Sequence, residues 1–136
     1  MPVHHDRHAA DRRKRRSADP ITALHYQLAA IRREARFDAL VLVDETGCMV
    51  AGAGAWPVCE ELAAYAPLLS DRSKIRRTVV GARVAAIGDE AESMHFEVDG
   101  QRVLLCGRGG LSSRNAALGR AALGVRRILG PAPVGV

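Results

Sequence analysis

Residues 37–69 read FDALVLVDETGCMVAGAGAWPVCEELAAYAPLL and constrain the fold more than any other stretch of this chain. The apolar run LVLV reaches an acidic turn, DETG, and a second run of small apolar residues leads into a helix-like segment. Gly47 lies in the turn, where a short hairpin usually requires a positive backbone φ. The pattern predicts a strand–turn–strand–helix unit with no catalytic side chain at its centre. Such a unit is a scaffold that presents surfaces, which favours a binding module.

The length and composition are those of one small domain with an aliphatic core. The chain has 136 residues, of which 48% are apolar and only 4% aromatic. A core of Ala, Val, Leu and Ile can be built from this composition, but few rings remain to stack on bases or sugars. We expect a basic disordered tail over residues 1–19, a domain over 20–130 and a flexible C-terminus over 131–136.

The net charge of +5 is unevenly distributed. Residues 1–20 contain six Arg or Lys against three Asp, and five of the six form one run. This run could contact phosphates nonspecifically, on nucleic acid or on an anionic surface, and a purely solubilising tail is the alternative. The candidate phosphate contacts are Arg12, Arg13, Lys14, Arg15 and Arg16.

Cysteine usage and hydropathy predict a cytoplasmic protein. The three cysteines are widely spaced, so a disulfide framework is not expected. There is no apolar run of 18 residues for a transmembrane helix, and no apolar segment follows the charged N-terminus as in a signal peptide.

Helical spacing appears on both sides of the hairpin. Asp19-Pro20 resembles a cap and first helical position, and an apolar stripe follows at Ile21, Leu24, Leu28, Ile31 and Ala35. Pro57 can open a second helix, with Glu60 and Glu61 in its first turn and Pro67 as a kink or early end. Its apolar face is predicted at Val58, Leu62, Tyr65, Ala66 and Leu69.

The second half of the chain predicts three strands and a last helix. Arg83–Ile87 is a candidate strand, Met94, Phe96 and Val98 alternate with polar residues, and Asp99-Gly100 is a hairpin turn leading into Arg102–Cys106. Ser112 or Ser113 can cap the helix, in which Gly119 and Gly124 are expected to pack closely on the sheet. Its inward residues are predicted to be Leu118, Ala122, Val125 and Leu129.

The order helix, two strands, helix, three strands, helix defines the expected fold class. Hairpins joined without crossovers give an antiparallel sheet. We therefore expect an α+β fold, with a five-stranded antiparallel sheet and helices on both of its faces.

This order, with the motif VLVDETGCMVAGAG followed by EELAAYAPLL, resembles the roadblock/dynein light chain family, in particular its small bacterial members. The matching hairpin positions are Val41, Val43, Asp44, Gly47 and Val50. The resemblance covers residues 20–130, and the hairpin is its distinctive part. The basic tail and the basic connector Ser70–Thr78 depart from the family pattern.

The resemblance implies a roadblock/profilin-like fold and a non-enzymatic regulatory or scaffolding subunit. Such a subunit forms a homodimer through the second helix and binds a small Ras-like GTPase or another signalling protein. The interface is expected at Val58, Glu60, Glu61, Leu62, Tyr65 and Leu69. A profilin-like or GAF-like ligand-sensing domain and a basic DNA-associated accessory protein are the alternatives.

The remaining candidate sites are weaker, and no catalytic residue, metal or cofactor is expected. Cys48, Cys59, Cys106 and His95 lack the close ligand pair of a structural zinc site, so buried apolar roles are expected for the cysteines. Gly107–Ser113 lacks the spacing and lysine of a phosphate-binding loop. His4, His5 and His8 are interpreted as incidental tail residues, and Asp44 and Glu45 as turn residues.

Overall fold

A computed structural model describes residues 19–70, 90–110 and 113–130 of the chain. This part contains α2 (Pro20–Ala35), β1 (Phe37–Val43), β2 (Met49–Gly54), α3 (Trp56–Ser70), β3 (Ala91–Val98), β4 (Gln101–Gly109) and α5 (Arg114–Leu129). The predicted α+β class is confirmed, with four antiparallel strands among the described residues. The fifth strand, predicted at Arg83–Ile87, lies outside the described residues and stays a prediction, as does the basic tail.

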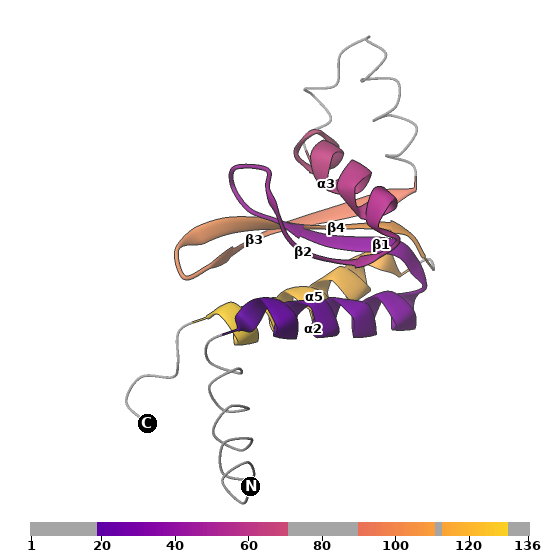
Figure 1. Ribbon diagram of the computed structural model, residues 1–136. Coiled ribbons are helices and arrows are strands. Elements are labelled where there is room, and N and C mark those ends of the chain that lie inside the picture. The colour runs from indigo at the N-terminus through magenta and orange to yellow at the C-terminus, as the bar shows by residue number, and fades with distance from the viewer. Residues whose placement is uncertain (1–18, 71–89, 111–112, 131–136) are drawn as a thin grey trace, which may run out of the picture.

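The sheet has the order β2-β1-β4-β3, and helices lie on both of its faces (Figure 1). β1 is an inner strand that pairs with β2 and β4, as its apolar run predicts. Alternate residues of a strand point to opposite faces. Leu40 and Leu42 therefore pack beneath α2 and α5, whereas Ala39, Val41 and Val43 pack beneath α3.

Both predicted hairpin turns form. Gly47 has a φ of 88°, and the Asp44 carboxylate accepts hydrogen bonds from the Thr46 hydroxyl, the Cys48 N–H at 3.0 Å and the Thr46 N–H at 2.9 Å. These bonds lower the pKa of Asp44 below its usual 3.8. In the second turn, Asp99 and Gly100 have φ values of 51° and 77°, as a two-residue hairpin requires.

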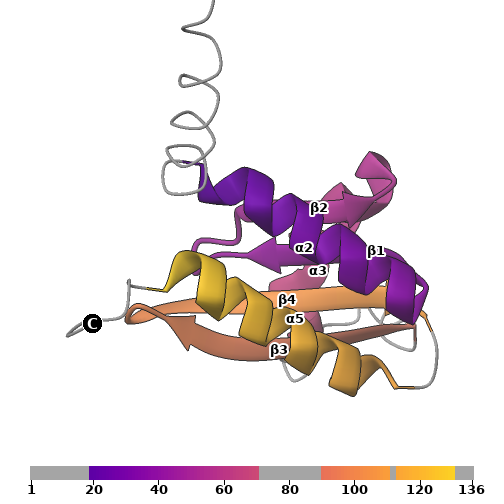
Figure 2. The same ribbon diagram turned by 90° about the horizontal axis from the view of Figure 1, so that it is seen from below.

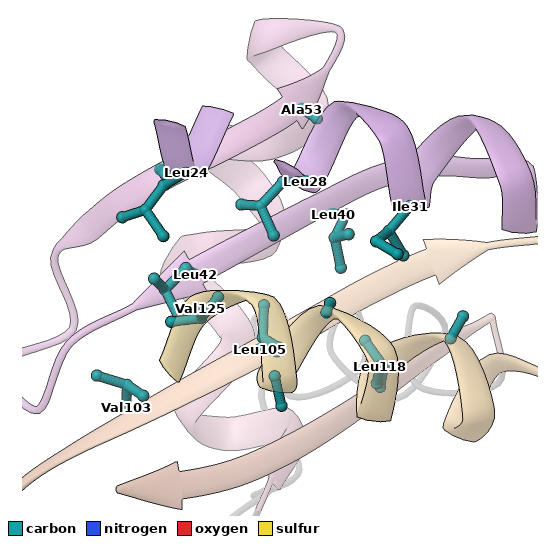
Figure 3. Packing of buried hydrophobic residues seen from close by; sticks show 14 of the residues in the cluster. Leu24, Leu28, Ile31, Leu40, Leu42, Ala53, Val103, Leu105, Leu118 and Val125 are labelled. Atoms are coloured by element: carbon teal, nitrogen blue, oxygen red, sulfur yellow. The ribbon is translucent and has the colours of Figure 1, made fainter. Parts of the chain in front are cut away.

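Helices α2 and α5 lie side by side on one face of the sheet (Figure 2). The Asp19 carboxylate caps α2 by accepting a hydrogen bond from the Thr22 N–H at 3.2 Å, which confirms the predicted start of that helix. Side chains from α2, β1, β4 and α5 point toward one another in the core between these helices and the sheet (Figure 3). The prediction for Ile21 is wrong, because it lies in the first turn, off the end of the packed stripe, and is 41% exposed.

The two glycines of α5 differ in surroundings. A Cβ on Gly124 would lie 2.2 Å from Nε2 of Gln27, so Gly124 allows α5 to approach α2 closely. Close packing is therefore confirmed at Gly124, although its partner is a helix and not the sheet. The same prediction is wrong for Gly119, where an added Cβ would meet nothing within 4 Å. No helix in the described ranges is long and apolar enough to cross a membrane.

Candidate interaction face on helix α3

Helix α3 has an unusual composition for a helix that covers a sheet alone. Only two of its 15 residues, Glu60 and Glu61, are charged. A helix at the surface of a protein normally carries polar residues on the side away from the core, and a helix that is apolar all round is normally buried. The composition of α3 therefore favours burial of both its inner side, against the sheet, and its outer side, against a partner.

The inner side of α3 is buried against the sheet. Cys59, Leu62 and Ala66 have no exposed surface, and Leu69 is 8% exposed. They form one cluster with the residues of β1 that point toward α3 and with Leu104 and Cys106 of β4. Packing of this stripe on the sheet accounts for the position of the helix.

This packing assigns two of the predicted interface residues to the core of the protomer. Leu62 and Leu69, two of the predicted interface residues, belong to the core of the protomer and do not have the exposure that a contact with a partner requires. The reason is that Ala39, Val41 and Val43 of β1 point toward α3 and bury these side chains. Val58 and Tyr65 lie half-buried at the margin of the same cluster. That α3 contacts a partner stays a prediction, as does a role for Val58 and Tyr65 in that contact, whereas Leu62 and Leu69 face the sheet.

The opposite side of α3 is exposed and mostly apolar. Pro57, Glu60, Ala64 and Pro67 recur at spacings of three and four, which places them on one helix face. Trp56 lies at the start of the helix and is 51% exposed. We call these five residues the α3 outer face. Only Glu60 among them is a predicted interface residue, although the helical spacing of Pro57, Glu60, Ala64 and Pro67 is visible in the sequence.

The two glutamates of α3 have different roles. The helix begins at Trp56, so both lie in its second turn, and the prediction of first-turn acids is wrong. Glu61 is half-buried and accepts a hydrogen bond from Arg108 of β4 at 3.3 Å, while Arg108 also pairs with Glu90 at 3.3 Å. Glu61 therefore ties α3 to the sheet. Glu60 is exposed and is the charged residue of the α3 outer face.

The cysteines and His95 do not converge on a metal site in the described ranges, which contain no suitable group of three or more ligands. Burial raises the pKa of Cys59, and it raises the pKa of Cys106 to about 12, with the negative charge of Glu92 adding to the effect. Both thiols are therefore protonated at neutral pH. Cys48 is exposed, so the prediction that it is buried is wrong. Partial burial and nearby Arg102 lower the pKa of His95.

The glycine-rich segment after β4 is engaged in protein contacts. The Gly109 N–H donates to the Glu90 carbonyl at 2.6 Å, and the Gly109 carbonyl accepts from Nε of Arg114 at 2.8 Å. Ser113 precedes α5 as its cap residue but makes no capping bond through its side chain. Gly109 therefore offers no free N–H to an anion, while Leu111 and Ser112 lie outside the described residues.

The fold and the α3 outer face together define a small α+β chain with a candidate protein-binding surface. No family model matches the chain, and no curated protein matches it. Among solved structures, the chain is similar to Myxococcus xanthus MglB, with 15% sequence identity and a TM-score of 0.48. The match covers 81% of this chain and 90% of that chain.

Proposed function

We propose that the α3 outer face joins two copies of this chain into a homodimer, which serves as a non-enzymatic regulatory or scaffolding subunit for a small Ras-like GTPase. The proposal rests on the exposed and mostly apolar outer side of α3. A helix with two charged residues in 15 leaves Trp56, Pro57, Ala64 and Pro67 exposed in the protomer. Burial of this face against a second copy gives α3 the surroundings that its composition favours.

A two-fold axis near the middle of α3 suits the residues of the face. In a two-fold contact the same surface is used by both subunits, and a residue close to the axis meets its own copy. Ala64 lies midway between Glu60 and Pro67, and its small side chain lets two helices approach. In an antiparallel arrangement centred on Ala64, each Glu60 is directed toward Pro67 of the partner subunit, so the two carboxylates stay apart.

The dimer is tested by Ala64→Glu, with Ala116→Glu as its matched control. Both alanines are exposed on helices, so each substitution should change the stability of the protomer by only about 0.5 kcal/mol. Light scattering at tens of micromolar should give twice the 14.6 kDa chain mass for wild type and Ala116→Glu, and the chain mass for Ala64→Glu. Trp56 emission should shift to the red on dilution of wild type only. A monomeric wild type would refute the dimer.

The GTPase as partner rests on the resemblance of the hairpin motif to the roadblock/dynein light chain family. Phosphate release is measured with this protein alone, with a purified Ras-like GTPase of the source organism alone, and with both. We expect no turnover by the protein alone and binding that differs between GTP-loaded and GDP-loaded GTPase. Glu60→Lys reverses a charge of the α3 outer face, so it should weaken dimerisation and GTPase binding together without removing the Glu61–Arg108 ion pair. Turnover by the protein alone, lost on mutation of one of its own side chains, would refute the non-enzymatic assignment.

A further inference from the structure

The face of the molecule opposite α3 carries a concentration of positive charge. Helices α2 and α5 contain six arginines and one glutamate, and α5 has no acidic residue at all. The single glutamate, Glu34, is exposed on α2. The two helices lie next to each other on the sheet, so their charges share one side of the molecule (Figure 2).

Three of these arginines are engaged within the protein. Nε of Arg32 donates to the Asp38 carbonyl at 3.3 Å, Arg114 contacts Gly109, and the guanidinium of Arg126 lies 5.5 Å from the centre of the Phe96 ring. The other three, Arg33, Arg120 and Arg127, form no side-chain hydrogen bond or ion pair with any residue in the described ranges. Arg33, Arg120 and Arg127 are therefore available to an external anion.

Two large apolar side chains lie among these available arginines. Tyr26 is 74% exposed on α2, and Leu123 is 65% exposed on α5. Arg33 follows Tyr26 by two helical turns, and Arg120 and Arg127 flank Leu123 at spacings of three and four. Helical spacing thus places each arginine on the same outward face as an apolar residue. We call Tyr26, Arg33, Arg120, Leu123 and Arg127 the α2–α5 outer face.

We propose that the α2–α5 outer face docks on the surface of a lipid bilayer that contains anionic lipids. Arg33, Arg120 and Arg127 contact lipid phosphates, while Tyr26 and Leu123 enter the headgroup layer. Apolar and aromatic residues flanked by arginines are the combination that binds such an interface. In the sequence, the basic run Arg12–Arg16 ends three residues before Asp19.

A bilayer fits this face better than a nucleic acid does. Base readout in a duplex needs an element that enters a groove, whereas α2 and α5 lie side by side on the sheet (Figure 2). Single strands bind through rows of aromatic side chains, whereas this face has one aromatic residue and an exposed leucine. A face that combines positive charge with exposed apolar side chains matches the chemistry of an anionic headgroup layer.

Vesicle binding by the full chain tests the proposal. Flotation is compared on phosphatidylcholine vesicles and on vesicles in which one third of the lipid is phosphatidylglycerol. We expect binding only to the anionic vesicles, with loss at high salt. Each arginine near an anionic surface is worth about fivefold in affinity, so R33Q/R120Q/R127Q should bind on the order of 100-fold more weakly. Arg120→Gln alone should lose about fivefold, and Arg102→Gln on the α3 side should lose less.

The orientation is tested by fluorescence. Native Trp56 lies on the α3 side and should keep its emission when vesicles bind. In a Trp56→Phe background, the indole introduced by Leu123→Trp should shift to the blue and be quenched by brominated lipid. Equal vesicle affinity of R33Q/R120Q/R127Q and wild type would overturn the proposal. So would a triple variant that loses affinity for duplex DNA but keeps its vesicle binding, or an unshifted indole at position 123.

Discussion

The two faces of the sheet are built alike on the inside and differently on the outside. Beneath α2 and α5 lies a cluster of 18 buried apolar residues, and beneath α3 lies one of 11, counted over the described residues. Both clusters are mostly aliphatic and include alternate residues of β1. Helices α2 and α5 together contain six arginines and one glutamate, whereas α3 contains two glutamates and no basic residue.

The buried stripe of a helix therefore does not determine what the helix binds. Leu62 and Leu118 are both fully buried and hold their helices to the same sheet. The residues that distinguish the two faces are the outward ones, Ala64 on one side and Leu123 with its neighbouring arginines on the other. Separate partners for the two faces follow from this segregation of charge, since an anionic surface attracts one face and repels the other.

The largest effect is expected from a charge in either core. Leu62→Asp should destabilise the protein by more than about 4 kcal/mol, because an unpaired carboxylate would be buried beneath α3. Leu118→Asp should do the same beneath α5, whereas Ala64→Asp should leave the protomer folded. Circular dichroism and urea unfolding measure the three variants. If the Leu62→Asp variant were folded and monomeric, Leu62 would belong to the dimer interface and not to the core beneath α3.

The reactivity of buried thiols measures the free energy needed to open the helix layer on each face of the sheet. Cys48 should react with a thiol reagent at once, whereas buried Cys59 and Cys106 have raised pKa values and react only after the α3 side opens. Their labelling should be slower by about 1000-fold or more, equivalent to an opening free energy of about 4 kcal/mol.

A matched probe extends this test to the other face. Val125 is fully buried under α5, so Val125→Cys places a thiol in the larger cluster. It should label more slowly than Cys59, because α3 is a single helix with an internal proline. Mass spectrometry after timed labelling, in a Cys48→Ser background, separates the sites. Faster labelling at position 125 than at Cys59 would show that the α2–α5 side opens more easily than the α3 side, contrary to this prediction.

A pair of glycine substitutions in α5 tests how the two-helix layer is packed. Gly124→Val should cost about 1–3 kcal/mol, since a branched side chain would displace Gln27 and separate α5 from α2. Gly119→Ala should gain up to about 1 kcal/mol through helix propensity, because space is open there. Urea unfolding measures both changes. Equal effects at the two positions would show that α2 and α5 do not approach each other as described.

Local patterns in the sequence predicted most of the described fold. Asp19-Pro20, Gly47 and Asp99-Gly100 mark element boundaries through capping and turn chemistry that acts over a few residues. The partner of Gly124 was not predictable in this way, because the register of α5 against α2 depends on contacts between residues nearly a hundred positions apart.

The candidate site was predicted less well than the fold. The apolar stripe of α3 was recognised, but periodicity cannot say which apolar residues the sheet will cover and which remain exposed. Leu62 and Leu69 were therefore assigned to an interface, and Ala64 and Pro67 were passed over. The ion pair of Glu61 with Arg108 joins residues 47 positions apart, and no local sequence pattern predicts it.

The smallest effect concerns the two glutamates of α3. Glu61→Gln removes the ion pair with Arg108, whose side chain is 20% exposed against 33% for Glu61, so solvent screens much of the attraction. The loss should be at most about 1 kcal/mol and should shrink in high salt, whereas Glu60→Gln should leave stability unchanged. Urea unfolding in the Ala64→Glu background keeps the protein monomeric and isolates the effect within one protomer. A larger loss for Glu60→Gln than for Glu61→Gln would assign Glu60 to the fold and remove the charged residue from the α3 outer face.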